Sequence, residues 1–335
     1  MGDWASVLNA DSTDWLLGTD NPSVRYFTLT ELLERPETET EVFSAKSEIM
    51  RIGTVPKILD KQNNQGYWET SEQFYTAKYK GSVWQLIILA ELGADGNDER
   101  IKKACEFILK TSQDVESGGF SVYYSSKVGG GRHGAVIPCL TGNMVYSLIK
   151  FGFFEDSRVE RGINWIIKYQ RFDDGQGHAL KGWPYETATS CFSKHSCHMG
   201  ASKALKALAQ IPENKRSNNV KNLIQVGAEY FLIHHIYKRS HDLSRDSKPG
   251  WRKLGFPLMY QTDVLEIMEI LTGLGYRDER MQEAIDLIIS KQDDFGRWTL
   301  ESTFNGRFQT NIEQKGKQSK WITLRALKVL KKFNI

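Results

Sequence analysis

The chain has 335 residues, of which 40% are hydrophobic and 25% are charged, so it has the composition of an ordinary folded protein with a full core. The net charge is +3, and acidic and basic residues are mixed along the chain, which argues against a nucleic-acid-binding surface. No apolar run approaches the roughly 18 residues that span a bilayer, and no secretory signal pattern is found at the N-terminus. We therefore expect a cytoplasmic protein without a transmembrane segment.

An internal repeat is the clearest feature of the sequence. Residues 62–68 and residues 292–298 both fit the pattern Gln-x-x-x-Gly-x-Trp, and degenerate copies begin at Gln113 and Gln170. The step is about fifty to sixty residues, with one copy eroded near 234–241. Glycine allows a tight turn, tryptophan can pack between repeats, and glutamine can bond to exposed groups at helix ends. The turns are therefore expected to be structural and not catalytic.

Paired helical patterns lie between these turns, with capping residues at their starts and often glycine after their ends. One member of each pair is apolar and rich in small residues, whereas the other is amphipathic. The sequence predicts an all-α fold of five to six helix pairs in a single domain covering residues 1–335, arranged as an open solenoid or a closed ring. The predicted inner, apolar helices are 24–33, 82–92, 141–151, 201–211, 263–274 and 322–333, and the outer ones are 98–111, 157–168, 218–232 and 278–290.

The Gln-x-x-x-Gly-x-Trp motif resembles the repeat motif of squalene–hopene-type triterpene cyclases. The pattern of the inner helices is similar to that of protein prenyltransferase β subunits. This resemblance covers nearly the whole chain and implies an (α/α)6 toroid, with a prenyltransferase- or cyclase-like enzyme acting on an isoprenoid or other apolar substrate in a central cavity. The Asp-x-Asp-Asp and Asp-Asp-x-x-Asp motifs of terpene chemistry are absent, which counts against an ordinary triterpene cyclase.

Cysteine and histidine cluster just before one predicted inner helix. Cys191, His195 and Cys197 lie in this cluster, and Cys139 holds a similar place one repeat earlier. Zinc favours four Cys or His ligands in a tetrahedron, so these residues predict a zinc site, with His198 competing with His195 as the imidazole. The alternative is that the cysteines are small buried residues and the histidines only satisfy hydrogen bonds.

The resemblance to prenyltransferase β subunits bears on the same residues. Their catalytic zinc is held by an Asp and a Cys at one inner-helix start and a His at the next. Cys139 resembles that Cys, and His195 or His198 resembles that His, but no Asp directly precedes Cys139. A site closed by four protein ligands would be structural, whereas three ligands and a water would favour catalysis.

A pair of carboxylates opens another predicted inner helix. Asp263 and Glu266 are three residues apart and share one helix face, so they are candidates for acid–base catalysis. The alternative is a capping role, with Thr262 or Asp263 at the N-cap and Glu266 as the capping-box acid. His241 lies in the eroded repeat, on a loop that we interpret as a possible lid, and is a third candidate catalytic residue.

Basic and aromatic residues gather near the starts of three predicted inner helices. Cationic side chains there could bind an anionic group such as diphosphate, and aromatic faces could shelter an isoprenoid. Ordinary core packing is the alternative for the tryptophans. The candidate substrate-binding residues are Tyr79, Lys80, Trp84, Tyr260, Lys320 and Trp321.

Two other functions fit the same pattern. One is a non-catalytic binding or scaffold toroid with a structural zinc, and the other is a zinc-dependent hydrolase. No face of the chain stands out as a site for a protein partner, so the expected ligand is a small apolar or isoprenoid molecule. A deep apolar lumen would favour a lipid substrate over a polar one.

Overall fold

The computed structural model describes residues 3–175 and 178–333, and most of them are in helices or in the loops between helices. The expectation of a helical chain is therefore confirmed. The longer helices, which carry the fold, are α2 (Pro22–Phe27) with its continuation η2 (Thr28–Leu32), α3 (Thr40–Ile49), α4 (Thr54–Leu59), α5 (Ser82–Glu91), α6 (Glu99–Thr111), α7 (Pro138–Lys150), α8 (Ser157–Tyr169), α9 (His198–Ala209), α10 (Asn218–Ile233), α11 (Val264–Gly273), α12 (Gln282–Ile289) and α13 (Lys320–Phe333).

Short elements complete the chain, and two of its loops form antiparallel hairpins in which β1 pairs with β2 and β3 with β4. These strands are too short to leave an alternating pattern in the sequence. The short elements are η1 (Asp3–Val7), α1 (Thr13–Leu16), β1 (Tyr124–Ser125), β2 (Gly130–Gly131), η3 (His133–Ala135), η4 (Glu213–Lys215), β3 (Lys238–Arg239), β4 (Asp242–Asp246), η5 (Pro249–Arg252) and η6 (Glu279–Met281).

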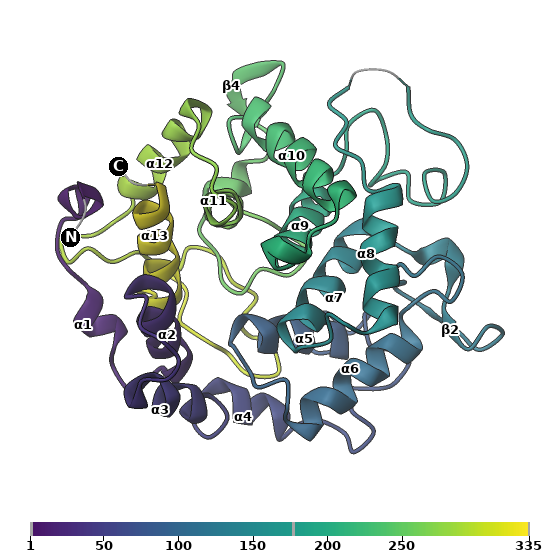
Figure 1. Ribbon diagram of the computed structural model, residues 1–335, viewed down its shortest axis with the longest axis horizontal. Helices are drawn as coiled ribbons and strands as arrows, with labels where there is room; N and C mark the ends of the chain where they lie inside the picture. The colour runs from purple at the N-terminus through teal and green to yellow at the C-terminus, as the bar shows by residue number, and fades with distance from the viewer. Residues whose placement is uncertain (1–2, 176–177, 334–335) are drawn as a thin grey trace.

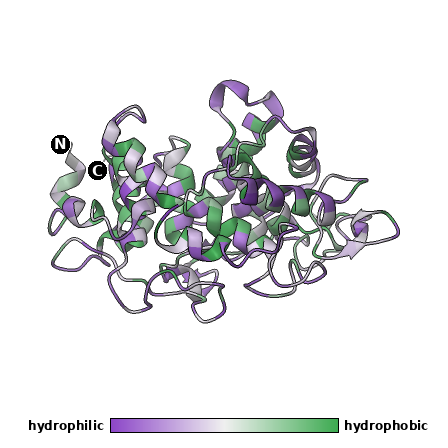
Figure 2. Ribbon diagram, turned by 90° about the horizontal axis from the view of Figure 1, so that it is seen from below, coloured by the Kyte–Doolittle hydropathy of each residue, from purple (hydrophilic) through white to green (hydrophobic). Residues whose placement is uncertain are grey.

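The apolar helices lie around the middle of the molecule and the amphipathic helices lie outside them (Figure 1). In the inner layer, α5 packs on α7, α7 on α9, α9 on α11, α11 on α13, and α13 on α2 and η2. Hydrophobic residues concentrate in the helices, and the connecting loops are largely hydrophilic (Figure 2). No helix in the described part of the chain is long and apolar enough to cross a membrane.

Capping residues begin the outer helices, at the predicted Asp98 and at one residue before the predicted starts Ser157 and Asn218. Asp98, Asp156 and Ser217 each accept a hydrogen bond from a backbone N–H in the first turn of α6, α8 and α10, respectively. Two inner helices begin three residues earlier than predicted, because Pro138 occupies the first turn of α7 and His198 the first turn of α9. Helices α3 and α4, the outer partners of α2, were not predicted.

The repeat turns join each outer helix to the next part of the chain. The Gln62 amide donates to the carbonyl oxygen of Arg100 in α6 at 2.9 Å, and the Gln113 amide donates to that of Arg158 in α8 at 2.7 Å. Gln292, in the last turn, donates to the carbonyl oxygen of Val7 at 2.8 Å, so it joins the C-terminal part of the chain to the N-terminal part. These glutamines thus bridge repeats that are separated in sequence.

The glycine and tryptophan of the two complete motifs have the same environment. Gly66 and Gly296 have positive φ angles, and a Cβ on either would meet a backbone oxygen within 2.5 Å. The indole of Trp68 donates to the carbonyl oxygen of Ile58 at 2.8 Å, and that of Trp298 donates to Ile288 at 2.7 Å. Both indoles are fully buried, so the turns are built into the core.

Candidate functional site

A cavity of about 410 Å³ lies between the inner helices, where α2, α5, α7 and α9 finish, and it extends along α11 and α13 to their first turns. All six inner segments contribute to its wall, and half of the lining side chains are charged or polar. The lining includes Phe27 and Glu31, Glu91 of α5, Tyr146 and Lys150 of α7, Lys206 and Gln210 of α9, Glu266, Glu269 and Gly273 of α11, and Trp321, Arg325, Lys328 and Lys332 of α13. This wall differs from the deep apolar lumen that would favour a wholly lipid substrate.

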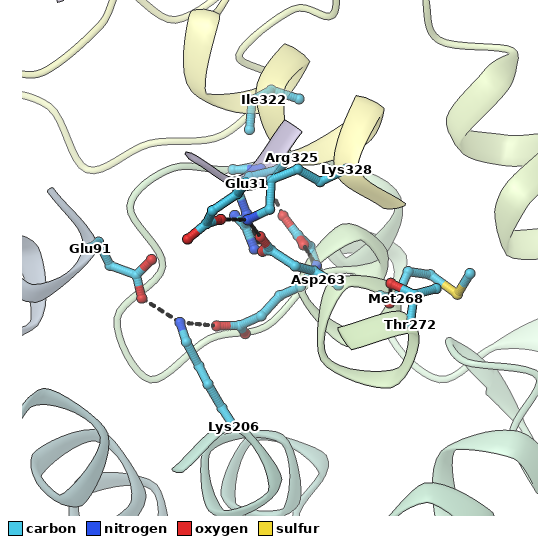
Figure 3. A network of polar contacts seen from close by, with 12 residues as sticks. Glu31, Glu91, Lys206, Asp263, Met268, Thr272, Ile322, Arg325 and Lys328 are labelled. Carbon is cyan, nitrogen blue, oxygen red and sulfur yellow. Dashed lines mark hydrogen bonds and ion pairs between the residues drawn. The ribbon is translucent and has the colours of Figure 1, made fainter. Parts of the chain in front are cut away.

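One side of the cavity is formed by an ion-pair chain between α9, α11 and α5. The ammonium of Lys203, which is fully buried, donates to both carboxylate oxygens of Glu266 at 2.6 Å. The ammonium of Lys206 lies 3.0 Å from Glu266 and also contacts the carboxylate of Glu91 (Figure 3). Two lysines and two glutamates therefore alternate in charge across three helices.

The other side is formed by a second chain between α13, α11 and η2. Glu269 accepts from Arg325 at 2.7 Å and from Lys328 at 2.7 Å, and Lys328 also pairs with Glu31 (Figure 3). These pairs hold α11 and α13 together and tie them to η2. Desolvating buried ion pairs of this kind costs free energy, and well-formed hydrogen bonds are needed to offset that cost.

The two predicted acids of α11 have different environments. Burial by itself would raise the pKa of Glu266, but Lys203 and Lys206 outweigh it and hold that pKa at about 2. Burial raises the pKa of Asp263 to about 6, although the charge of Arg325 opposes the shift. Glu266 is therefore a fixed anion at neutral pH and is not suited to donate a proton.

Asp263 is the N-cap of α11. One of its carboxylate oxygens accepts from the backbone N–H of Glu266 at 2.8 Å, and the other accepts from the N–H of Gly255 at 2.8 Å. The capping interpretation thus describes Asp263, but Glu266 points to the lysines and does not return a capping bond. The predicted role of these residues in catalysis stays a prediction.

Two lysines at the rim of the cavity differ from those in the ion-pair chains. Lys150 and Lys332 are exposed, and no carboxylate lies within ion-pair distance of either ammonium among the residues that the structure describes. The ammonium of Lys150 instead lies 5.8 Å from the ring centre of Phe27. The rim therefore has positive charge that the protein itself does not neutralise.

The opposite end, where the inner helices begin, is filled by aromatic rings. The structure brings together the predicted residues Tyr79, Trp84 and Tyr260: the rings of Tyr79 and Trp84 lie 5.0 Å apart, and those of Trp84 and Tyr260 lie 6.2 Å apart. The ammonium of Lys78 lies 4.8 Å from the Tyr260 ring and 5.3 Å from the Tyr75 ring. This aromatic cluster closes one end of the helix layer.

The other three predicted binding residues do not join that cluster. Lys80 is exposed, and Lys320 pairs with Asp20. Trp321 stacks on Phe256 with ring centres 4.3 Å apart and lines the central cavity. The six residues are therefore divided between the two ends of the inner layer and the outer surface.

The cysteines predicted to bind zinc lie at the starts of α7 and α9. The Cys191 thiol contacts Cys197, and this contact raises the pKa of Cys191. The same contact, together with the backbone N–H groups of Gly200 and Met199, lowers the pKa of Cys197 to about 6. Burial and the nearby Cys197 raise the pKa of Cys139 to about 12.

The histidines lie apart from the thiols. The His195 ring is mostly exposed, 3.6 Å from Asp174 and 6.2 Å from the ring of His241, which is also exposed. Over residues 3–175 and 178–333, no group of three or more His, Cys, Asp or Glu side chains is arranged to hold a metal ion. The predicted quartet of Cys139, Cys191, His195 and Cys197 is therefore not brought together as a metal-binding group in this part of the chain.

His198 has a different set of partners. The Tyr230 hydroxyl donates to the carbonyl oxygen of Ser196 at 2.9 Å, so its oxygen accepts from Nδ1 of His198 at 2.9 Å. Nε2 of His198 is then left as an acceptor, and it is buried without a partner in the described part of the chain. Burial lowers the pKa of His198 well below its usual value, so the ring is neutral.

The charged cavity was not predicted, although the sequence contains a signal for it. Lys203 and Lys206, Glu266 and Glu269, and Arg325 and Lys328 are pairs spaced three residues apart on otherwise apolar helices. Such spacing places both charges on one face, and a charged face on a buried helix requires partners or a ligand.

Comparisons with known proteins give few matches. No protein-family model and no curated protein matches the sequence. Among solved structures, a protein from Actinoplanes is similar over 99% of this chain and 100% of its own, with a TM-score of 0.47 and 13% identity. A type II terpene cyclase from Scytonema, in complex with its substrate geranylgeranyl dihydroxybenzoate, is similar over 94% of this chain and 87% of its own, with a TM-score of 0.41 and 13% identity.

Proposed function

We propose that this chain is an (α/α)6 toroid enzyme that binds a substrate with an anionic head and an apolar body, such as an isoprenoid diphosphate, in its central cavity. The observation that carries the proposal is the excess of cations around the cavity. Five basic residues and four glutamates line it, and two of the basic residues, Lys150 and Lys332, have no carboxylate partner among the described residues. An anionic group at the rim would supply the missing partner.

The toroid part of the proposal is supported by the order of the inner helices and by the last repeat turn. Each inner helix packs on the next from α5 to α13, and α13 packs on α2. Gln292 in that turn bonds to residues near the N-terminus: its side-chain oxygen accepts from the N–H of Asn9 at 2.8 Å, and its amide donates to Val7. Hydrogen bonds at this position join the first and last repeats.

The apolar part of the substrate is supported by the aromatic rings in the cavity wall. Phe27, Phe256 and Trp321 lie side by side there, with ring centres 6.0 Å apart for the first and third and 4.3 Å apart for the second and third. A cavity of about 410 Å³ falls in the range that holds small-molecule ligands. The wall thus offers an aromatic face below a cationic rim.

The test compares three probes that separate head from tail. Farnesyl diphosphate has both parts, inorganic diphosphate has only the head, and farnesol has only the tail. We expect calorimetry to give the tightest binding for farnesyl diphosphate, and release of inorganic diphosphate from it would establish an enzyme. Binding without turnover of any partner compound would favour the non-catalytic toroid, and equal affinity for farnesol and farnesyl diphosphate would contradict the proposed use of the rim.

A further inference from the structure

The loop before α9 folds back on itself and places two cysteines opposite each other. Phe192 and Ser196 form an antiparallel bridge, and the backbone N–H of Cys197 donates to the carbonyl oxygen of Cys191 at 3.2 Å. Residues that face each other across antiparallel strands have Cα atoms about 4.5–5.5 Å apart, within the range of about 4.4–6.8 Å that a disulfide requires. The pairing therefore places Cys191 and Cys197 opposite each other, a backbone arrangement in which a disulfide can form.

The side chains of Cys191 and Cys197 lie next to each other and interact, and neither cysteine is fully buried. Cys197 is the N-cap of α9, so it lies at the N-terminus of that helix. The tip of the loop, which includes Lys194, is exposed, and both cysteines are partly accessible.

We propose that Cys191 and Cys197 form a thiol–disulfide exchange site that reduces small disulfides such as glutathione disulfide. In the described part of the chain, no third His, Cys, Asp or Glu side chain joins this pair in a group that could hold a metal ion. The ammonium groups of Lys194 at the loop tip and of Lys248, whose charge acts on Cys197, suit the carboxylates of such a reagent.

The reaction balances in two steps. The sulfur of Cys197 attacks one sulfur of the disulfide, a bond forms between protein and reagent, and the first thiol leaves with the proton that Cys197 loses. Cys191 then attacks the sulfur of Cys197, which closes the protein disulfide and releases the second thiol with the proton of Cys191. Two electrons pass from the protein to the reagent.

The experiment incubates the purified full-length chain with glutathione disulfide and follows it by intact mass and peptide mapping. We expect wild type to lose two hydrogens in the peptide that contains both cysteines, with no lasting glutathione adduct. Cys191→Ser should keep one glutathione on Cys197, because the second attack is removed. Cys197→Ser should give neither product.

Two other cysteines provide matched controls. Cys105→Ser, in the buried face of α6, and Cys139→Ser, at the start of α7, should both still form the disulfide. Loss of closure in Cys139→Ser, with folding retained by circular dichroism, would overturn the assignment of the pair. Purified protein that contains one zinc and whose thiols react only after chelation would overturn the proposal in favour of a metal site.

Discussion

The inner helices α5, α7 and α9 finish beside a cavity lined by lysines and glutamates, whereas they begin in a closed cluster of aromatic rings and thiols. The same helices build both ends, and only one stripe of each helix faces the middle. On α9, Lys206 lines the cavity, and Cys197 lies about two to three turns earlier at the closed end. The difference teaches that one layer of helices can hold charged side chains around a cavity at one end and pack aromatic rings and thiols closely at the other.

Breaking the buried ion pairs between the two ends should give the largest loss of stability. Lys203→Met removes the closest cation of the buried Glu266 and should lower the free energy of unfolding by about 3–5 kcal/mol, as for other broken buried ion pairs. Urea unfolding measures this loss. The double variant Lys203→Met, Glu266→Leu should recover most of it, since Lys206 keeps Glu91 as a partner. A loss below about 1 kcal/mol in the single variant would contradict a tight pair.

The carboxyls at the start of α11 should give opposite dependences on pH. The pKa of Asp263 is raised to about 6, so the folded state binds this proton more tightly than the unfolded state, and stability falls as the pH rises from about 4 to about 6. The difference corresponds to about 3 kcal/mol. Asp263→Asn keeps the cap but cannot ionise. Urea unfolding measured between about pH 4 and about pH 7 should therefore show a smaller loss of stability in this variant than in wild type.

Glu266 provides the control for that experiment. Its pKa is held at about 2, so its contribution to stability is complete above the unfolded value of 4.5 and is lost only as the pH falls toward 2. The Asp263→Asn variant should therefore keep the same loss of stability in acid as wild type. A change confined to the acid range would show that the assignment of the two groups is reversed.

The closed end should affect stability without affecting ligand binding. The indole of Trp84 donates to the carbonyl oxygen of Tyr75 at 2.8 Å, so Trp84→Phe should cost about 1–3 kcal/mol through the lost bond. Its affinity for farnesyl diphosphate should match wild type. Trp321→Phe, in the cavity wall, is the matched substitution and should weaken that affinity. Equal effects of both variants on binding would remove the distinction between the two ends.

The smallest expected effect is at the rim. Lys150→Gln should weaken farnesyl diphosphate binding about two- to fivefold, because an exposed ion pair contributes about 0.2–1 kcal/mol. The effect should shrink as salt is added, since exposed charges are screened. Calorimetry at two salt concentrations measures both. Lys57→Gln, on the exposed face of α4, is the control and should leave affinity unchanged.

The sequence determined the helices and the turns between them. Periodicity and capping residues place a helix within three residues of its observed start for α5 through α11 and within four for α12, because these signals act over a few neighbours. The repeat glutamines, glycines and tryptophans could likewise be assigned structural roles, since tight turns and buried indoles restrict which residues fit. The first outer helices were missed because α3 and α4 are short and α3 has little apolar periodicity.

Only the tertiary structure decided which polar groups meet. Lys203 and Glu266 are 63 residues apart, and the pairing of their charges depends on the packing of α9 against α11. The same holds for the cysteines: spacing alone suggested zinc with His195, whereas the fold of the loop turns Cys191 toward Cys197 and leaves His195 beside Asp174. The sequence specifies the chemistry of each side chain. The distance and orientation between side chains that are far apart in the sequence are set by tertiary packing, which local sequence patterns do not encode.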